Sequence, residues 1–268
     1  MTIGTFPFGQ PIQRVAQHDR KPKHVFVLGV YASAVHARWC NVRGRQLVRA
    51  LAVASEPCIF WRGDESGKEV IEILSKIDVS PQVGRLEPAA RNLNGPSGRS
   101  LDEDYLKPLG LTRNEAWLCD LVPHSCMNSG QAKAVETHYT PLVKQHGLPD
   151  VDWPTVPGKL TDKARQKEIA AELRESTAQI VITLGDLPLK WFGAAFGSKG
   201  SLKAYGKDAE SYGRLQNFDF EDRSLKLMPL VHPKQAAGLG GHNPQWKALH
   251  ENWVRRTAPE LVTYLKTG

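Results

Sequence analysis

Four short apolar runs stand out along the chain, and each ends at or just before a glycine or a proline. Runs of this kind are typical of strands that are buried on both faces of a parallel sheet. Segments with helical spacing lie between them, so strand and helix alternate. The pattern predicts an α/β fold with three layers, α/β/α, around a central four-stranded, mainly parallel sheet. The runs are Val25–Leu28, Trp117–Val122, Gln179–Leu184 and Leu225–Val231.

Helices are predicted where apolar residues recur every three or four positions. The run of Val70, Ile73 and Leu74 predicts a helix over 67–76. Further helices are expected at Leu101–Leu109, from a cap at Thr161 or Asp162 to Ser176, and around the stripe of Trp246, Leu249 and Trp253 near the end of the chain. A helix is also expected to begin soon after the first strand, with helix or loop over Ala37–Gly44, and a strand pair or a strand and a bend around Glu56. The segments Arg214–Phe220 and Leu225–Val231 form a hairpin or strand pair, preceded by a flexible basic flap at Gly193–Gly213.

The basic N-terminal residues 1–22 contain no strand-like run, so they are expected to form a loosely attached arm. The rest, 23–268, is expected to be a single domain. The formal net charge of +7 favours a polyanionic partner such as DNA. No apolar run approaches the roughly 20 residues of a membrane span, and the N-terminus does not resemble a secretory signal.

The four cysteines lack zinc-site spacing. We therefore expect a monomeric cytoplasmic protein that needs no membrane, metal or cofactor.

Polar residues gather where the predicted strands end. Gly29 ends the first strand, Asp120 lies near the end of the second with His124 beyond it, and His232 follows the last. Because ligands of open α/β sheets bind beyond the carboxyl ends of the strands, these residues are the first candidates for a site.

With these segments side by side, the chain resembles the uracil-DNA glycosylase superfamily, over roughly two-thirds of its length. GVYAS is placed like the water-activating loop, and RNLNGPSGRSLDE is similar to the R-P-F-x-G-x-x-G loop and helix. LTRNEAWLCDLVPHSCMN is similar to the strand that carries the base-reading Asn, ITLGD to the third strand, and VHPKQ to the closing H-P-S motif. These segments are Gly29–Ser33, Arg91–Glu103, Leu111–Asn128, Ile182–Asp186 and Val231–Gln235. The resemblance implies a fold like that of the superfamily and base flipping from DNA.

Departures from the superfamily pattern change the expected chemistry. Leu93 stands where a Phe stacks on uracil, and Asp120 stands where an Asn reads it. Pro123 occupies the position of a cluster-ligating Cys, so no iron–sulfur cluster is expected. The first loop carries no acid at residues 30–32, which leaves the water-activating residue unassigned.

His232 and Asp120 are the candidate catalytic residues. By the resemblance, His232 stabilises the departing base, whereas an isolated His-Pro favours a local capping role. An ionised Asp120 only accepts hydrogen bonds, which suits the exocyclic amine of cytosine better than uracil. Two other roles stay open for Asp120: activating water, or serving as a buried acceptor. Leu93 in place of Phe leaves room for a bulky 5-substituent.

The remaining candidates would contact the substrate. Tyr31 covers the flipped base or a phosphate, or packs in the core. Gly29 and Ser33 hold a phosphate, His124 is a reserve contact, and Leu239 is either a wedge that fills the vacated stack or an ordinary loop residue.

The sequence thus predicts a monofunctional DNA glycosylase that excises a 5-substituted cytosine, hydroxymethylated or glucosylated, leaves an abasic site and acts in defence against phages whose DNA carries that base. A uracil or mismatch glycosylase of base-excision repair is one alternative. An inactive nucleic-acid-binding member of the same fold is the other.

Overall fold

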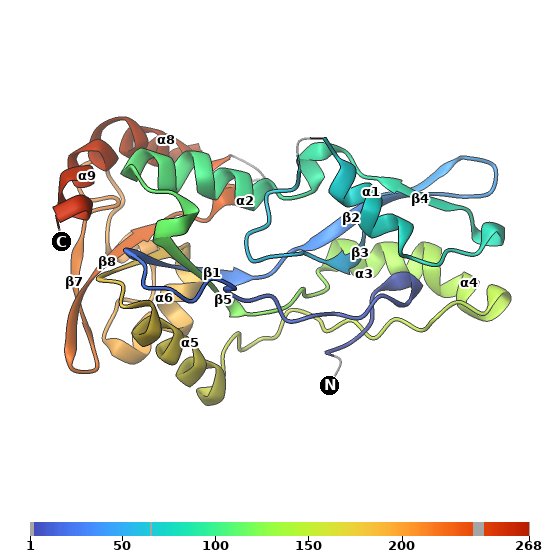
Figure 1. The fold of residues 1–268 in the computed structure, drawn as a ribbon, viewed down its shortest axis with the longest axis horizontal. Helices are drawn as coiled ribbons and strands as arrows, with labels where there is room; N and C mark the ends of the chain where they lie inside the picture. Colours follow the sequence, from blue (N-terminus) through green and yellow to red (C-terminus); the bar gives the residue numbers. More distant parts are fainter. Residues whose placement is uncertain (1–2, 65, 238–243, 268) are drawn as a thin grey trace. The chain divides into compact units, whose positions relative to one another are not determined.

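A computed structural model describes residues 3–64, 66–237 and 244–267 of the chain (Figure 1). The chain forms two compact units rather than the expected arm and single domain. Unit 1 comprises residues 1–15, 31–99 and 123–158, and unit 2 comprises residues 16–30, 100–122 and 159–268. The chain passes between the units five times, and two of these passages follow the first and the second predicted strand.

Unit 2 contains a five-stranded, mainly parallel sheet with the order β5-β1-β6-β8-β7. β1 pairs with β6 in parallel, and β6 pairs with β8 in parallel. Strands β1 and β6 are almost wholly apolar and buried because both faces of the sheet are covered. The strands are β1 (Val25–Tyr31), β5 (Ala116–Val122), β6 (Ile180–Leu184), β7 (Gln216–Phe220) and β8 (Arg223–Leu230).

The four predicted strands are all present, and the sheet has one strand more than expected. The fifth, β7, is the antiparallel hairpin partner of β8, which confirms the predicted strand pair. Its residues alternate between buried and exposed, as an edge strand with one covered face does.

Helices cover both faces of the unit 2 sheet. In Figure 1, α5 and α6 lie on one side of the sheet, and α8 and α9 lie on the other. α5 begins as predicted, because the Asp162 side chain accepts the Arg165 backbone N–H at 2.8 Å. The helices are η4 (Leu101–Leu106), η5 (Lys107–Leu109), η6 (Arg113–Glu115), α5 (Lys163–Ser176), α6 (Asp186–Trp191), η8 (Gly193–Phe196), η9 (Leu202–Ala204), α7 (Pro233–Ala236), α8 (Pro244–Asn252), η10 (Trp253–Thr257) and α9 (Ala258–Thr267).

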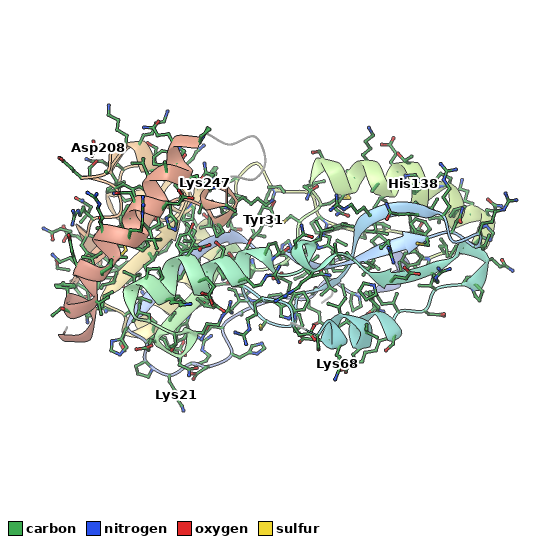
Figure 2. The ribbon with its side chains drawn as sticks, turned by 90° about the horizontal axis from the view of Figure 1, so that it is seen from above. Lys21, Tyr31, Lys68, His138, Asp208 and Lys247 are labelled. Carbon is green, nitrogen blue, oxygen red and sulfur yellow. The ribbon has the colours of Figure 1, made fainter. Side chains whose placement is uncertain are left out.

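Lys21 and Lys247 of unit 2 are exposed, and Lys21 lies at the periphery of the view in Figure 2.

Unit 1 is built on a three-stranded antiparallel sheet with the order β3-β2-β4. The prediction of a helix soon after the first strand is wrong, because the chain forms the strand β2 there. Val35, Ala37 and Trp39 are buried on one face of β2 and pack in the unit 1 core, and this period of two identifies a strand. The elements are η1 (Pro7–Gly9), β2 (Ala34–Cys40), β3 (Gln46–Ser55), α1 (Lys68–Ser75), η2 (Pro81–Val83), β4 (Arg85–Pro88), η3 (Arg91–Leu93), α3 (Ser129–Ala134), η7 (Val135–Tyr139) and α4 (Thr140–His146), with α2 (Pro96–Ser100) ending at the first residue of the middle segment of unit 2.

The N-terminal residues are part of the unit 1 core. Phe6 and Phe8 are 0% and 3% exposed, and the Phe8 ring lies edge-on to Trp39 and Tyr139, with centroids 5.3 and 5.1 Å away. The Tyr139 hydroxyl accepts the Phe8 N–H at 2.9 Å and donates to the Pro149 carbonyl at 2.8 Å. Residues 3–15 therefore contribute side chains to the core, where the sequence favoured a loose arm.

Candidate functional site at the carboxyl ends of the unit 2 strands

Asp120 lies near the carboxyl end of β5 and is 3% exposed. The sulfur of its neighbour Cys119 lies 3.4 Å from Nη2 of Arg165 on α5, so Cys119 faces that helix. Because side chains alternate along a strand, the Asp120 carboxyl group points to the opposite face of the sheet. There, its Oδ1 has no hydrogen-bond partner in the described part of the chain.

The buried carboxyl group of Asp120 has an unusual proton affinity. Burial raises its pKa from 3.8 to about 7; the charge of Arg165 lowers it and that of Glu172 raises it. Near neutral pH the group is therefore a mixture of carboxylate and neutral acid. The neutral acid both donates and accepts, whereas the carboxylate only accepts. The sequence argument assumed the ionised form alone.

Arg165 holds the backbone on which Asp120 stands. Its Nη2 donates to the Asp120 carbonyl at 2.6 Å and its Nε to the Leu121 carbonyl at 3.1 Å. Its Nη1 lies 3.4 Å from Glu172, which also accepts the indole N–H of Trp117 at 3.1 Å. These bonds connect β5 to α5 and fix the position of Asp120 near the carboxyl end of the strand.

His232 follows β8 and caps the short helix α7. Its Nδ1 accepts the Lys234 N–H at 3.2 Å, and its backbone N–H donates to Oε1 of Gln235 at 3.3 Å. An Nδ1 that accepts leaves the proton of the neutral ring on Nε2. The local capping role considered from the sequence is present, and it orients the ring with Nε2 as the donor.

Gly185, directly after β6, lies against His232. Its N–H donates to the Leu230 carbonyl at 2.7 Å. Its φ of +91° and ψ of −173° form a backbone conformation that is essentially restricted to glycine. A Cβ at this position would lie 3.3 Å from Cβ of His232. Gly185 therefore lets β6 end close beside the candidate histidine.

We expect Gly185→Ala to lower the free energy of unfolding by about 1–3 kcal/mol, because the backbone conformation is strained for any L side chain. The new methyl group should also displace His232. Gly197→Ala is the control: Gly197 has φ +80°, but no atom of the described residues lies within 4 Å of the position that its methyl group would take. Denaturant unfolding measures the stability of both variants. A Gly185→Ala protein as stable as the Gly197→Ala protein would contradict this account.

The sheet order fixes the spacing between the two candidate catalytic residues. β1 and β6 lie between β5 and β8, which places the backbones of Asp120 and His232 roughly 14 Å apart, three strand spacings of about 4.8 Å. After β1 the chain forms β5 on one side of β1 and then β6 on the other side. The direction in which strands are added to the sheet therefore reverses between β1 and β6. Ligands of open α/β sheets bind at such a point. A ligand across the ends of β1 and β6 would have Asp120 on one side and His232 on the other.

The other predicted site residues lie in different places. Gly29 is inside β1, which continues to Tyr31, so the predicted strand end at Gly29 is wrong. Since β2 follows rather than the expected helix, Gly29 and Ser33 do not lie at a turn from strand to helix. Tyr31, Ser33, Leu93 and His124 belong to unit 1, and Leu239 lies outside the described residues.

Within unit 1, burial and the nearby Cys126 thiol raise the pKa of Tyr31. Nδ1 of His124 lies 3.0 Å from the Ser125 carbonyl oxygen.

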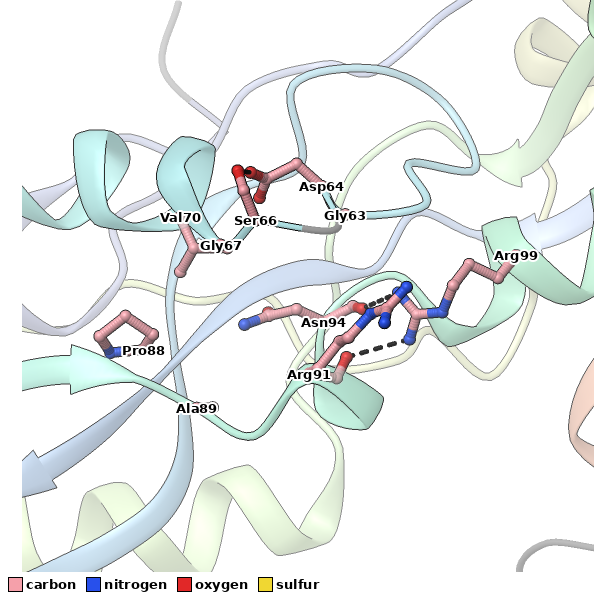
Figure 3. A pocket seen from close by; sticks show the side chains of 10 residues that line it. All are labelled: Gly63, Asp64, Ser66, Gly67, Val70, Pro88, Ala89, Arg91, Asn94 and Arg99. Atoms are coloured by element: carbon pink, nitrogen blue, oxygen red, sulfur yellow. Dashed lines mark hydrogen bonds between the residues drawn. The ribbon is translucent and has the colours of Figure 1, made fainter.

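The glycine-bearing loop that contains Leu93 is held by side-chain bonds within unit 1. The Asn94 amide pairs with the backbone of His36, at 2.7 and 2.9 Å. Arg99 donates to the carbonyls of Arg91 and Asn94, at 3.0 and 2.7 Å, as Figure 3 shows. These polar residues support the loop itself. They border a cavity of about 200 Å³ between this loop and the start of α1 (Figure 3).

A second cavity, of about 580 Å³, lies in unit 2 at the amino ends of β1 and β6, with His24, Ile180 and Tyr264 in its wall. Gly185 and His232 lie at the opposite, carboxyl ends of the strands. Neither of these two cavities is lined by Asp120 or His232.

Sequence reasoning missed Thr183, on β6. It is 1% exposed, and its Oγ1 has no hydrogen-bond partner in the described part of the chain. It pairs in register with Leu28 of β1, one residue before Gly29. The sequence signal that could have identified Thr183 is its hydroxyl group in an otherwise apolar strand. Asp120 and Thr183 are thus two buried polar groups of unit 2 with an unused hydrogen-bonding atom, a state that calls for a bound polar group or water.

Over the described residues, no helix is long and apolar enough to cross a membrane, and no cluster of three His, Cys, Asp or Glu side chains is arranged to hold a metal ion. Compared with protein-family models and with curated proteins, the sequence matches none. The structure therefore describes the protein by its fold and site. It is an α/β protein with a buried acid whose pKa is near neutral and a helix-capping histidine, both near the carboxyl ends of the strands of a mainly parallel sheet.

Proposed function

We propose that this protein is a DNA glycosylase that flips a nucleotide out of DNA and hydrolyses the N-glycosidic bond of a 5-substituted cytosine. The observation that carries the proposal is Asp120: a buried carboxyl group with a pKa of about 7 and an unused oxygen, on the strand where the resembling superfamily has its base-reading residue. Perturbed groups of this kind mark functional sites. The net charge of +7 suits a DNA partner.

The two candidate catalytic residues take different roles. Expulsion of the base leaves negative charge on its ring, and a fixed donor at that ring stabilises the charge. Nε2–H of His232 is that donor, since Nδ1 is already occupied by the Lys234 N–H. Asp120 contacts the amine edge of the base. Cytosine bases with hydroxymethyl or glucosyl groups occur in phage DNA, so this substrate would make the protein a defence enzyme.

Base preference should depend on pH. The neutral acid of Asp120 can pair with uracil, donating to O4 and accepting from N3–H, and it can equally pair with the N3 and N4 edge of cytosine. The carboxylate accepts from the N4 amine of cytosine, whereas it repels the O4 oxygen that uracil has at the same position. We therefore expect the ratio of kcat/KM for modified cytosine over uracil to rise as the pH passes about 7.

Taking this ratio removes pH effects common to both substrates. In Asp120→Asn, which does not titrate, the ratio should be independent of pH. A ratio that stays flat in the unchanged protein would show that Asp120 does not read the base; a bell-shaped profile shared by both substrates would instead fit water activation.

The direct test of the proposed function is product formation. The protein is incubated with duplex and single-stranded DNA that contains uracil, hypoxanthine, hydroxymethylcytosine or its glucosylated form, and abasic sites are then cleaved with alkali. Product from the cytosine derivatives, lost in His232→Ala and retained in the exposed control His18→Ala, supports the proposal. Product from uracil alone would identify a repair enzyme. Tight DNA binding without product from any base would identify an inactive binding protein.

A further inference from the structure

The backbone just before His232 is held by two buried tyrosines, in addition to the bond from the Gly185 N–H to the Leu230 carbonyl. β8 ends at Leu230, so the polar groups of Val231 lie beyond the strand. The Tyr212 hydroxyl accepts the Val231 N–H at 3.0 Å, and the Tyr105 hydroxyl donates to the Val231 carbonyl at 2.8 Å. Both tyrosines are at most 1% exposed. The peptide units on either side of Val231 are therefore both fixed by side chains.

The direction of this hydrogen-bond chain is set by His250, on α8. Its Nε2 lies 3.1 Å from the Asp104 carbonyl oxygen, which can only accept, so Nε2 carries the proton. Nδ1 therefore accepts, and its partner is the Tyr212 hydroxyl at 2.9 Å. The Tyr212 proton is committed to His250, which leaves the oxygen lone pairs for the Val231 N–H.

The aromatic neighbours of His250 hold its ring in place. The Tyr105 ring centroid lies 4.4 Å from that of His250, and the Trp253 ring stacks on it at 5.3 Å. Tyr105 of η4 and Tyr212 of the segment before β7 thus bond to Val231, and His250 of α8 orients the second of these tyrosines. The segment that was expected to be a flexible flap is anchored here, because Tyr212 is buried.

We propose that Tyr212, oriented by His250, is a positioning residue that sets the placement of the His232 imidazole. Val231 directly precedes His232 in the chain, and the His232 ring accepts the Lys234 N–H of the same segment, so the position of the ring depends on where Val231 lies. The Tyr212 hydroxyl fixes Val231 and thereby the point from which the imidazole reaches the leaving base. The expected loss of catalytic activity rests on the proposed function, whereas the expected placement of the His232 ring does not.

Tyr212→Phe tests the inference in the full-length protein, with Tyr139→Phe as the matched control. The Tyr139 hydroxyl is equally buried and also accepts a backbone N–H, but it lies in unit 1 and donates to a backbone carbonyl, whereas Tyr212 donates to His250. Each variant loses two hydrogen bonds of its hydroxyl group. We expect Tyr212→Phe to lower kcat roughly 10- to 100-fold, the effect of misplacing a catalytic group by about an ångström, with KM changed less than about twofold. Tyr139→Phe should leave kcat unchanged.

The position of His232 is measured separately by NMR of its imidazole ¹H and ¹³C signals, assigned with His232→Gln. Tyr212→Phe should shift these signals and Tyr139→Phe should not, whether or not any base is excised. Unchanged signals in a folded Tyr212→Phe protein, or an equal loss of kcat in both variants, would overturn the inference. If Tyr212→Phe does not fold, Tyr105→Phe removes the other bond to Val231 and the same outcomes apply. Shifted signals without activity on any base would refute the proposed function alone.

Discussion

At pH 8, Asp120→Asn is expected to be more stable than the unchanged protein by on the order of 4 kcal/mol, whereas at pH 4 the two should be nearly equal. The pKa of Asp120 is about 7 in the folded chain and 3.8 when the group is exposed to water. A difference of about three pKa units corresponds to roughly 4 kcal/mol. The amide has nearly the same shape as the carboxyl group but carries no charge to bury.

The sign follows from proton binding. Below pH 3.8 both states hold the proton, so the carboxyl group has no effect. Between pH 3.8 and 7 the unfolded chain loses its proton while the folded chain of the unchanged protein keeps it, and the free energy of unfolding falls as the pH rises. Above pH 7 the destabilisation is complete. Asp120→Asn should therefore gain its advantage between about pH 4 and 7.

Denaturant unfolding at pH 4, 6 and 8 measures this difference. Asp219→Asn is the control, because Asp219 is exposed on the edge strand β7 and should show little change. A constant difference between Asp120→Asn and the unchanged protein across the pH range would show that Asp120 titrates as an exposed acid. That result would remove the observation on which the proposed function rests.

The fold of unit 2 could be predicted from the sequence because its strands are continuous apolar runs. Ala116–Val122 and Ile180–Leu184 were placed within a residue or two for this reason, and α5 was placed by its Asp162 cap. Unit 1 was missed. Its strand Ala34–Cys40 consists of small and mixed residues, and a period of two over seven residues is easily mistaken for the start of a helix.

The site could be predicted only in part. Residue types at strand ends pointed to Asp120 and His232, since a strand end is visible as a break in an apolar run. Burial raises the pKa of Asp120 and so decides its charge. It depends on the segments that cover the strand, which the residues next to Asp120 in the sequence do not reveal. The bonds to Val231 join residues 19 and 126 positions away along the chain, so no sequence pattern contains them.

His250 should act on stability in the direction opposite to Asp120. Burial lowers its pKa from 6.5 to about 4, and the nearby Asp104, through its carbonyl and its charge, only partly offsets this. As the pH falls from 6.5 towards 4 the unfolded chain gains a proton and the folded chain does not, so stability falls. The shift of between two and three units corresponds to a loss of about 3 kcal/mol at pH 4. The groups packed around the ring are Tyr105, Tyr212 and Trp253, and they stay uncharged over this range.

Because the two effects oppose each other, the unchanged protein should show a shallow dependence of stability on pH between 4 and 7. Asp120→Asn removes one effect and should reveal a stability that falls as the pH falls. His250→Gln removes the other and should reveal a stability that rises as the pH falls, on top of a constant loss from the broken bond to Tyr212. In the double variant both slopes should vanish, since distant sites act additively. Unfolding curves of the four proteins at pH 4.5, 5.5, 6.5 and 7.5, with His18→Gln as an exposed control, measure the two slopes separately. Equal slopes in the two single variants would show that neither buried group has the proton affinity that its surroundings impose.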